Sequence, residues 1–163
     1  MDKHDRSLLK NVSLKNPWHF LALGFGSGLL PKAPGTYGSL AATPFCYALM
    51  HLDYKLALLV IVLTYIVGTY ATFVTEKALK MHDNSAIVID EFVGMFISVL
   101  FFPPKLYLVA MAFVLFRIFD VIKPFPIGFL DKRIAGANGV MIDDVLAGIF
   151  ALACGHLIVY FFI

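Results

Sequence analysis

The run LALLVIVLTYIVGTYATFV, residues 56–74, decides the fold class of this chain. Its 19 residues include no Asp, Glu, Lys or Arg. An α-helix rises about 1.5 Å per residue, so a run of this length crosses the hydrocarbon core of a bilayer. A second run of 19 such residues, VLAGIFALACGHLIVYFFI, occupies 145–163. Two runs of membrane-crossing length predict an all-α protein that is partly surrounded by lipid.

The composition of the whole chain supports this interpretation. Hydrophobic residues make up 60% of the 163 residues, charged residues make up 15%, and the mean hydropathy is +0.84. Soluble domains average about 45–50% apolar and about 25% charged residues. The net charge of +2 is too small to indicate a nucleic-acid partner. The length suits one domain, so we expect 1–163 to form a single domain with a polar cytoplasmic tail at 1–16.

Three further apolar runs, 40–52, 92–102 and 106–116, are too short to cross a bilayer unaided. We interpret them as helices whose charged ends lie at the depth of the lipid headgroups. A re-entrant or partly submerged arrangement is the alternative. With the two long runs, they predict an integral membrane helical bundle of about five apolar helices, some of them short or partly submerged.

Charge is distributed unevenly between the connecting segments. The connectors 51–55 and 102–105 are short, so each should join an antiparallel pair of helices. The longer segments 1–39, 75–91 and 117–144 then lie on one side of the membrane. Eleven of the 13 Lys and Arg residues fall in these longer segments: Lys3, Arg6, Lys10, Lys15, Lys32, Lys77, Lys80, Arg117, Lys123, Lys132 and Arg133. By the positive-inside rule, this side faces the cytoplasm.

Acidic residues gather at helix ends on the same side. Five of them directly flank predicted helices: Asp90, Glu91, Asp120, Asp143 and Asp144. Because the helices alternate in direction, these side chains should reach one membrane level and could share a pocket. Clustered carboxylates near lipid repel one another and need a compensating cation, and ligands that are all oxygen suit Mg²⁺. The alternative is that acids at helix N-termini only complement the helix dipole.

The segment FRIFDVIKP at 116–124 adds basic residues to this level. Arg117, Asp120 and Lys123 follow one another at a spacing of three, which places them near one helix face. Arg117 and Lys123 could bind phosphate oxygens while Asp120 binds the metal ion. An intrahelical salt-bridge ladder that also anchors the cytoplasmic end is the alternative. Pro124 should end this helix.

A glycine-rich stretch, GFGSGLLPKAPGTYGS, covers 24–39. It lacks the G-K-[ST] of a Walker A loop and no βαβ pattern surrounds it, which argues against nucleotide binding. It does place backbone amides and the hydroxyls of Thr36 and Ser39 just before a helix expected to begin near Leu40. A helix N-terminus suits a phosphate group, so both residues are candidate substrate contacts. N-capping by Ser39 is the alternative.

Several phosphatase chemistries lack their signature residues here. The sequence has no C-x₅-R loop of a cysteine phosphatase, no D-x-D-x-[TV] of an aspartyl-phosphate enzyme and no K-x₆-R-P set of the histidine-dependent lipid phosphatases. Water activated by a metal ion is the remaining chemistry. The five carboxylates are then the candidate catalytic and metal-binding residues.

Four blocks in collinear order carry a family resemblance: GFGSGLLPKAPGTYGSLAATPF (24–45), VIDEFVGM (88–95), FRIFDVIKPFPI (116–127) and GVMIDDVLAG (139–148). They resemble the phosphatidylglycerophosphatase A family, and NPWHFLALGFGSG (16–28) resembles its proteobacterial members. The resemblance implies a Mg²⁺-dependent hydrolase that converts phosphatidylglycerophosphate in the inner leaflet to phosphatidylglycerol, as a multi-pass protein of the bacterial inner membrane. It implies catalytic and metal-binding roles for the five acids and phosphate contacts by Thr36, Ser39, Arg117 and Lys123.

Two other functions compete with this interpretation. A cation transporter would also carry acidic residues in the membrane, but it needs them on a path open to both faces, whereas these gather at one face. A phosphatase that acts on another phosphorylated lipid, such as phosphatidic acid, fits the same residues. None of these readings requires an obligate protein partner.

Overall fold

The computed structural model describes residues 9–82, 84–131 and 136–162, with side chains for all of these except residues 130 and 131. Every element within these ranges is helical, so the predicted all-α class is confirmed. The elements, with η denoting a 3₁₀ helix, are η1 Leu9–Asn11, α2 Pro17–Ala22, η2 Gly24–Leu29, α3 Pro34–Leu49, α4 Tyr54–Leu79, α5 Ile89–Ser98, α6 Leu106–Ile122, α7 Ile127–Asp131 and α8 Ala137–Phe162. The first half of the predicted polar tail, together with Lys132 and Arg133, lies outside the described residues.

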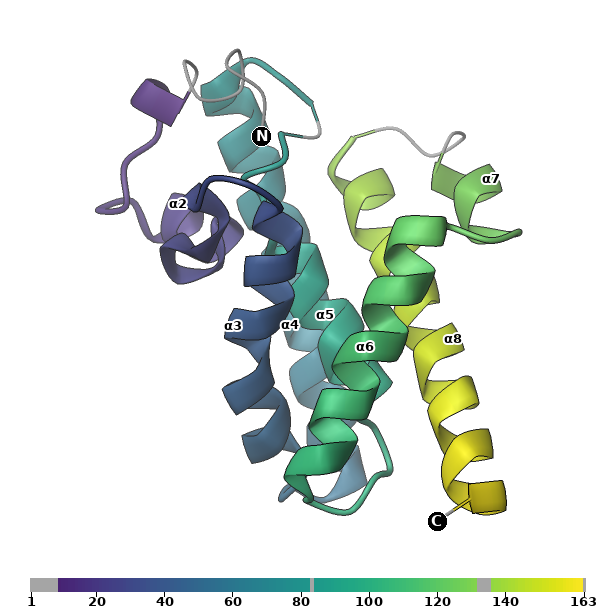
Figure 1. The fold of residues 1–163 in the computed structure, drawn as a ribbon. Coiled ribbons are helices and arrows are strands. Elements are labelled where there is room, and N and C mark those ends of the chain that lie inside the picture. Colours follow the sequence, from purple (N-terminus) through teal and green to yellow (C-terminus); the bar gives the residue numbers. More distant parts are fainter. Residues whose placement is uncertain (1–8, 83, 132–135, 163) are drawn as a thin grey trace.

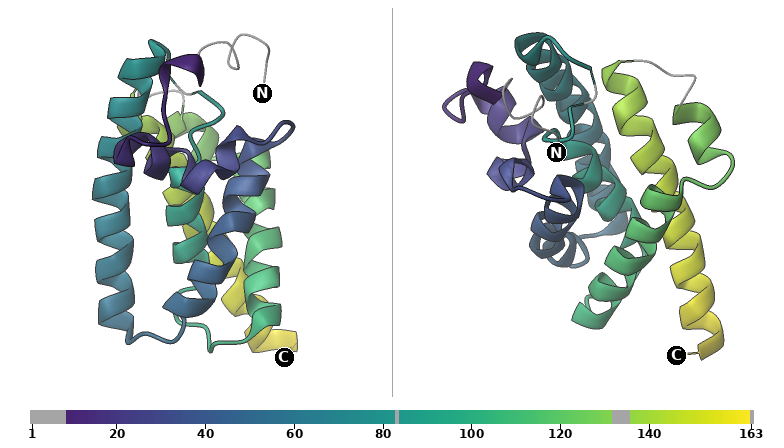
Figure 2. Two further views of the ribbon diagram at one scale, coloured as in Figure 1. Left: turned by 90° about the vertical axis from the view of Figure 1, so that its left-hand side faces the viewer. Right: turned by 45° about the horizontal axis from the view of Figure 1, so that its top comes forward.

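The chain folds back and forth along the bundle, as predicted (Figure 1). α3, α4, α5, α6 and α8 alternate in direction, so the α3–α4 and α5–α6 connections and the C-terminus lie at one end. The N-terminal elements, the segment after α4 and the short helix α7 lie toward the opposite end, as the left view of Figure 2 also shows. Arg117 and Lys123 therefore belong to one end of the bundle, and Lys55 and Lys105 belong to the other.

α5 is the shortest of these five helices and lies inside the bundle. Eight of its ten residues are buried, and it packs against α3, α4, α6 and α8. Phe92, Val93 and Met95 of α5 belong to the main hydrophobic core. The apolar run at 92–102 therefore contributes the centre of the bundle rather than one of its outer helices.

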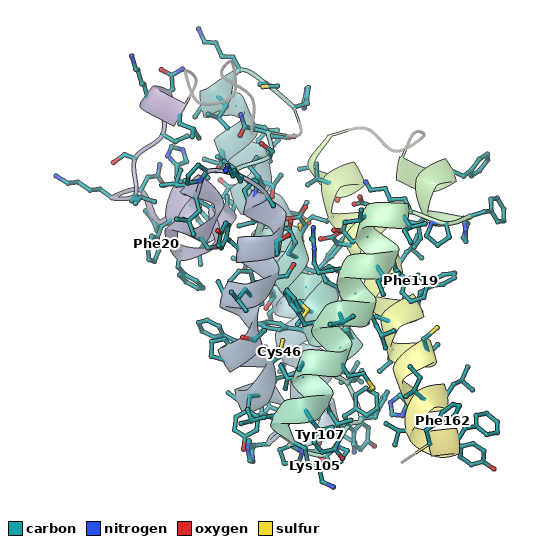
Figure 3. The ribbon with its side chains drawn as sticks, in the orientation of Figure 1. Phe20, Cys46, Lys105, Tyr107, Phe119 and Phe162 are labelled. Atoms are coloured by element: carbon teal, nitrogen blue, oxygen red, sulfur yellow. The ribbon has the colours of Figure 1, made fainter. Side chains whose placement is uncertain are left out.

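Two helices, α4 and α8, are long and apolar enough to cross a membrane. Only 28% and 22% of their most apolar windows are buried inside the protein, unlike the core helices of soluble proteins, which are mostly buried. Large apolar side chains are exposed along the bundle, and Figure 3 shows Phe20 and Phe162 projecting outward from it. α3 and α6, with 16 and 17 residues, are shorter. The structure thus has two helices of crossing length, which correspond to the two 19-residue runs, and three shorter helices, α3, α5 and α6.

α8 extends beyond the apolar run that predicted it. It begins at Ala137, eight residues before the apolar run starts at 145. Asp143 and Asp144, expected at the edge of this helix, are its seventh and eighth residues. The uncharged run at 145–163 covers only the apolar part of α8. Both carboxylates are buried between helices, so the helix continues through them instead of ending at the first charge.

Candidate active site

Five acidic side chains from α5, α6 and α8 meet in the half of the bundle that carries α7 (Figure 1). Carboxylate oxygens of Asp90, Glu91 and Asp144 lie within 4.8 Å of one another. Oxygens of Asp120, Asp143 and Asp144 form a second such group, so the two groups share Asp144. The structure therefore brings together all five acids that the sequence singled out. Asp90 and Glu91 lie in the first turn of α5, where they also complement the helix dipole. Asp120 lies near the C-terminal end of α6, where a negative charge does not complement the dipole.

Glycines allow α5 and α8 to approach closely at this point. A Cβ built on Gly148 of α8 would lie 2.5 Å from the carbonyl oxygen of Gly94 in α5, so the two backbones are in contact. Asp90 lies one turn before Gly94, and Asp144 lies one turn before Gly148. Residues one turn apart share a helix face. The closest contact between the helices therefore turns both carboxylates toward the same space.

Among the buried carboxylate oxygens of the cluster that have no hydrogen-bond partner within the described residues are Asp90 Oδ1, Glu91 Oε2 and Asp144 Oδ2. A buried anionic oxygen without a partner is unfavourable, and neighbouring carboxylates repel one another. A divalent cation coordinated by these oxygens offsets both effects. Mg²⁺ prefers oxygen ligands and commonly takes one or two carboxylates together with water and substrate phosphate. The residues present therefore fit the metal ion that the sequence predicts.

Arg117 of α6 is a basic residue in contact with this cluster. Its Nη1 lies 2.6 Å from Asp120 Oδ2 and 4.0 Å from Glu91 Oε1. The same nitrogen donates a hydrogen bond to Ser39 Oγ at 3.4 Å. Arg117 and Asp120 both belong to α6, so this ion pair is the one expected for the intrahelical salt-bridge ladder. Arg117 also reaches α3 and α5, so it links three helices at the edge of the acidic site.

Lys123 closes α6 and reaches α8. The helix ends at Ile122, just before Lys123 and Pro124, as predicted. Lys123 has a left-handed backbone with a φ of 44°, and its N–H donates to the carbonyl of Phe119. Its Nζ lies 2.6 Å from Asp143 Oδ2. The ion pair between Lys123 and Asp143 therefore links the end of α6 to α8. The salt bridges of segment 116–124 are thus not confined to α6, as a purely intrahelical ladder would require.

α3 begins earlier than predicted, which changes the position of Ser39. Pro34 is the first residue of α3, a position that tolerates proline, so Ser39 lies in the second turn and N-capping by Ser39 is wrong. Its buried hydroxyl donates to the carbonyl of Gly35 at 2.8 Å and accepts from Arg117. Ser39 thus positions the guanidinium. Thr36, half-buried in the first turn of α3, lies closer to the helix N-terminus.

Gly35 is a site residue that the sequence interpretation missed. A Cβ at this position would overlap Glu91 Oε1 and would lie 3.3 Å from Arg117 Nη1. The backbone of the first turn of α3 therefore lies directly against the acidic cluster. A glycine inside a helix often marks such a close approach. The sequence places glycines inside the helices at Gly35, Gly94 and Gly148, and these positions could have indicated the close approaches.

Fold and site together define a class: an all-helical, strongly apolar protein with a buried acidic site that suits a divalent cation and has an arginine at its edge. The sequence model of the family described as Phosphatidylglycerophosphatase A matches residues 20–159. The chain therefore belongs to the phosphatidylglycerophosphatase A family and is a phosphatase, which confirms the resemblance of its sequence blocks.

Named relatives cover most of the chain. A Phosphatidylglycerophosphatase A of Escherichia coli (strain K12) is 43% identical over 152 residues, which are 93% of this chain and 88% of the relative. A Phosphatidylglycerophosphatase A of Haemophilus influenzae is 46% identical over 146 residues, which are 88% and 90% of the two chains. A protein of Bacteroides thetaiotaomicron named Putative phosphatidylinositol-3-phosphatase is 40% identical over 139 residues, which are 80% and 86%. No solved structure matches the chain.

Proposed function

We propose that this chain is a Mg²⁺-dependent phosphatase that hydrolyses phosphatidylglycerophosphate to phosphatidylglycerol and inorganic phosphate. The observation that carries this proposal is the cluster of five buried or half-buried carboxylates, two of which lie within 4.0 Å of Arg117. A phosphomonoester dianion is repelled by such a cluster unless a cation lies between them. The two relatives named Phosphatidylglycerophosphatase A support the choice of substrate.

Proximity suggests the metal ligands. Asp90, Glu91 and Asp144 would hold one ion, and Asp120 and Asp143 complete a second set with Asp144. A divalent cation held there would offset the negative charge of the phosphate group and polarise its P–O bonds, which would favour attack by water on phosphorus. Asp144 belongs to both sets, so its removal should weaken metal binding most.

Arg117 binds the substrate phosphate in this mechanism. Its guanidinium offers parallel N–H donors that match two phosphate oxygens. Ser39 and Asp120 hold the guanidinium from two helices. Its positive charge offsets the charge that develops on the phosphate oxygens in the transition state. Lys123 and the hydroxyl of Thr36 offer further donors to the same group.

A carboxylate of the cluster accepts the proton of the attacking water. Asp90, Glu91 and Asp144 each carry a buried oxygen with no partner among the described residues, and these residues are also the candidate metal ligands. Asp143 lies in the same cluster, and one of its oxygens pairs with Lys123. Asp90, Asp143 and Asp144 are the candidates for the general base.

We infer that the protein is a multi-pass protein of a bacterial inner membrane with its site facing the cytoplasm. α4 and α8 have crossing length, and their apolar side chains are widely exposed. Arg117 and Lys123 lie at the end of the bundle that holds the site, in accord with the positive-inside rule. A lipid in the inner leaflet would reach the carboxylates without leaving the membrane. Acids gathered toward one end also disfavour a cation path open to both faces.

Purified protein in detergent tests the proposed function. Inorganic phosphate release should be measured from phosphatidylglycerophosphate, phosphatidic acid and phosphatidylinositol 3-phosphate, each with Mg²⁺ and with EDTA. The third lipid is included because of the name of the Bacteroides relative. We expect the fastest release from phosphatidylglycerophosphate with Mg²⁺ and little release with EDTA. Equal release in EDTA, or faster turnover of another lipid, would contradict the proposal.

Proteoliposomes test the transporter alternative. Reconstituted protein should be assayed for Mg²⁺ flux and for phosphate release under the same conditions. Phosphate release without flux is expected. Flux without phosphate release would support a transporter and remove the enzymatic role proposed for the five acids.

A further inference from the structure

An apolar groove of about 600 Å³ lies between α3 and α6 on the outside of the bundle. Its walls are formed by Leu40, Thr43, Pro44 and Tyr47 of α3 and by Leu106, Val109, Ala110, Phe113 and Val114 of α6. None of these residues is charged. The volume falls within the range of about 300–1,000 Å³ that is typical of ligand pockets. The groove is separate from the carboxylate cluster and suits an apolar occupant.

The groove leads to the phosphate-contact residues on both of its helices. On α6, Phe113 lies one helical turn before Arg117. On α3, Leu40 follows Ser39 directly and lies one turn after Thr36. Residues one turn apart share a helix face. Thr36 and Arg117 therefore lie one helical turn beyond the residues that line this end of the groove, so an apolar chain lying in it could be joined to a phosphate bound at Arg117.

Pro44 makes the α3 wall suitable for contact with lipid. It has no N–H, so the carbonyl of Leu40 lacks the donor that a regular helix supplies. The hydroxyl of Thr43 donates to this carbonyl instead, at 2.8 Å. The Leu40 carbonyl in this wall is therefore hydrogen-bonded. Contact with hydrocarbon requires this, because an unpaired backbone group is unfavourable there.

The groove and the helix up to Arg117 together match one leaflet of a bilayer in length. The groove follows α6 for about 12 Å, from Leu106 to Val114. Arg117 lies about 16 Å from Leu106 along the helix, and half of the hydrocarbon core is about 15 Å thick. We propose that the groove binds one acyl chain of the phospholipid substrate, with the phosphate of that lipid at Arg117. This inference rests on the proposed function and adds acyl-chain length to what the enzyme recognises.

A second apolar groove, of about 470 Å³, lies on the other side of α3 against α4 and α5. Its α3 wall begins at Phe45, about 13 Å along the helix from Thr36. The ring of Phe25 stacks on Phe45 at 5.5 Å, on the side nearer to η2. On α3 this groove therefore starts further from Thr36 than the α3–α6 groove does, although Ile89 and Phe92 of its α5 wall flank Asp90 and Glu91 in the sequence. It serves as an internal comparison.

Ala110 and Ala48 provide a matched pair of substitutions. Both are exposed alanines, Ala110 in the α3–α6 groove and Ala48 in the second groove. Ala110→Trp and Ala48→Trp each fill one groove without entering the core. The value of kcat/KM should be measured with dipalmitoyl and dihexanoyl phosphatidylglycerophosphate. Excluding about two methylene groups from the groove weakens binding about tenfold. Ala110→Trp should therefore lower the ratio of long-chain to short-chain kcat/KM about tenfold. Ala48→Trp should lower this ratio less than about twofold.

A lower ratio for Ala110→Trp alone supports acyl-chain binding between α3 and α6. Three results would overturn it. Equal losses for both chain lengths would indicate a structural effect of Ala110→Trp. A lower ratio for Ala48→Trp instead would place the chain in the second groove. Unchanged kcat/KM for both chain lengths in Ala110→Trp would mean that the α3–α6 groove holds only bulk lipid.

Crosslinking separates this inference from the proposed function. Wild-type protein should be irradiated with phosphatidic acid that carries a diazirine on one acyl chain, and the labelled residues mapped by mass spectrometry. Label at 40–47 and 106–114 that excess unlabelled phosphatidylglycerophosphate removes would support the groove, even if the protein released no phosphate from that lipid. Label spread evenly over the exposed faces of α4 and α8 would overturn it.

Discussion

Gly94 of α5 lies directly against the backbone of Asp144 in α8. A Cβ placed on Gly94 would lie 2.8 Å from the Asp144 carbonyl oxygen and would overlap the ring of Phe116. Asp90, one turn before Gly94, therefore lies beside the helix that carries Asp144. The distance between two helix backbones, more than the reach of the side chains, brings these carboxylates close enough to share an ion.

Gly148→Ala tests the importance of this helix contact. The new methyl group meets the backbone of Gly94, which cannot rotate away, so α5 and α8 must separate. We expect a loss of about 1–3 kcal/mol in the free energy of unfolding, as for other overpacked sites, and weaker apparent Mg²⁺ affinity. Thermal unfolding in detergent and a Mg²⁺ titration of activity measure the two effects.

Gly155→Ala, on the same helix, is the control for Gly148→Ala. The atoms nearest to its new methyl group are the side-chain ends of Phe102 and Met111, which can move. We expect Gly155→Ala to keep the wild-type Mg²⁺ dependence. A Gly148→Ala enzyme with that same dependence would show that the helix contact does not set the metal site.

Removing single charges from the cluster should stop the reaction. Asp144→Asn, Glu91→Gln and Asp120→Asn should each lower kcat by at least about 100-fold, because metal binding and proton transfer both need these carboxylates. Each variant should still insert into membranes, as fractionation can show. Asp53→Asn at the opposite end is the control, because Asn caps the start of α4 as Asp does. Near-normal turnover in all three acid variants with Mg²⁺ present would mean that the site is elsewhere.

Ser39 should affect catalysis through Arg117. Ser39→Ala removes a hydrogen bond to a charged group, so kcat/KM should fall about tenfold, and Arg117→Ala should lower it at least about 100-fold. In the double variant the two losses should not add, because Ser39 acts only by positioning Arg117. Thr69→Ala is the control, since the Thr69 hydroxyl makes the same kind of bond to a helix carbonyl, that of Tyr65. Full additivity would give Ser39 a role independent of Arg117.

Metal binding should be visible without turnover. At about a hundredfold excess over its dissociation constant, Mg²⁺ should stabilise the wild-type protein by about 2.7 kcal/mol, which a thermal shift in detergent detects after treatment with EDTA. Asp144→Asn should lose most of this shift, because Asp144 belongs to both groups of ligands. Asp53→Asn should keep it. An equal shift in Asp144→Asn would argue that Mg²⁺ binds at another place.

Much of the bundle could be predicted from local features of the sequence. Uncharged runs such as 56–74 indicate helices, and the uneven distribution of Lys and Arg indicates which connections share a side. Alternating helix directions then bring Asp120 and Asp144 to one level although they lie far apart in the chain. The ends of the helices were predicted less well. α8 starts before Asp143 because buried carboxylates can continue a helix when other helices enclose them.

The sequence by itself determined the all-α class, the order in which the chain folds back and the identity of the acids, because these depend on how each residue interacts with lipid or water. Only the tertiary structure decided how close the acids come, that Arg117 donates a hydrogen bond to Ser39 and that Gly35 and Gly94 touch the site. It also decided that an apolar groove lies between α3 and α6. Such distances depend on packing between residues that are remote in sequence, and no local pattern records them.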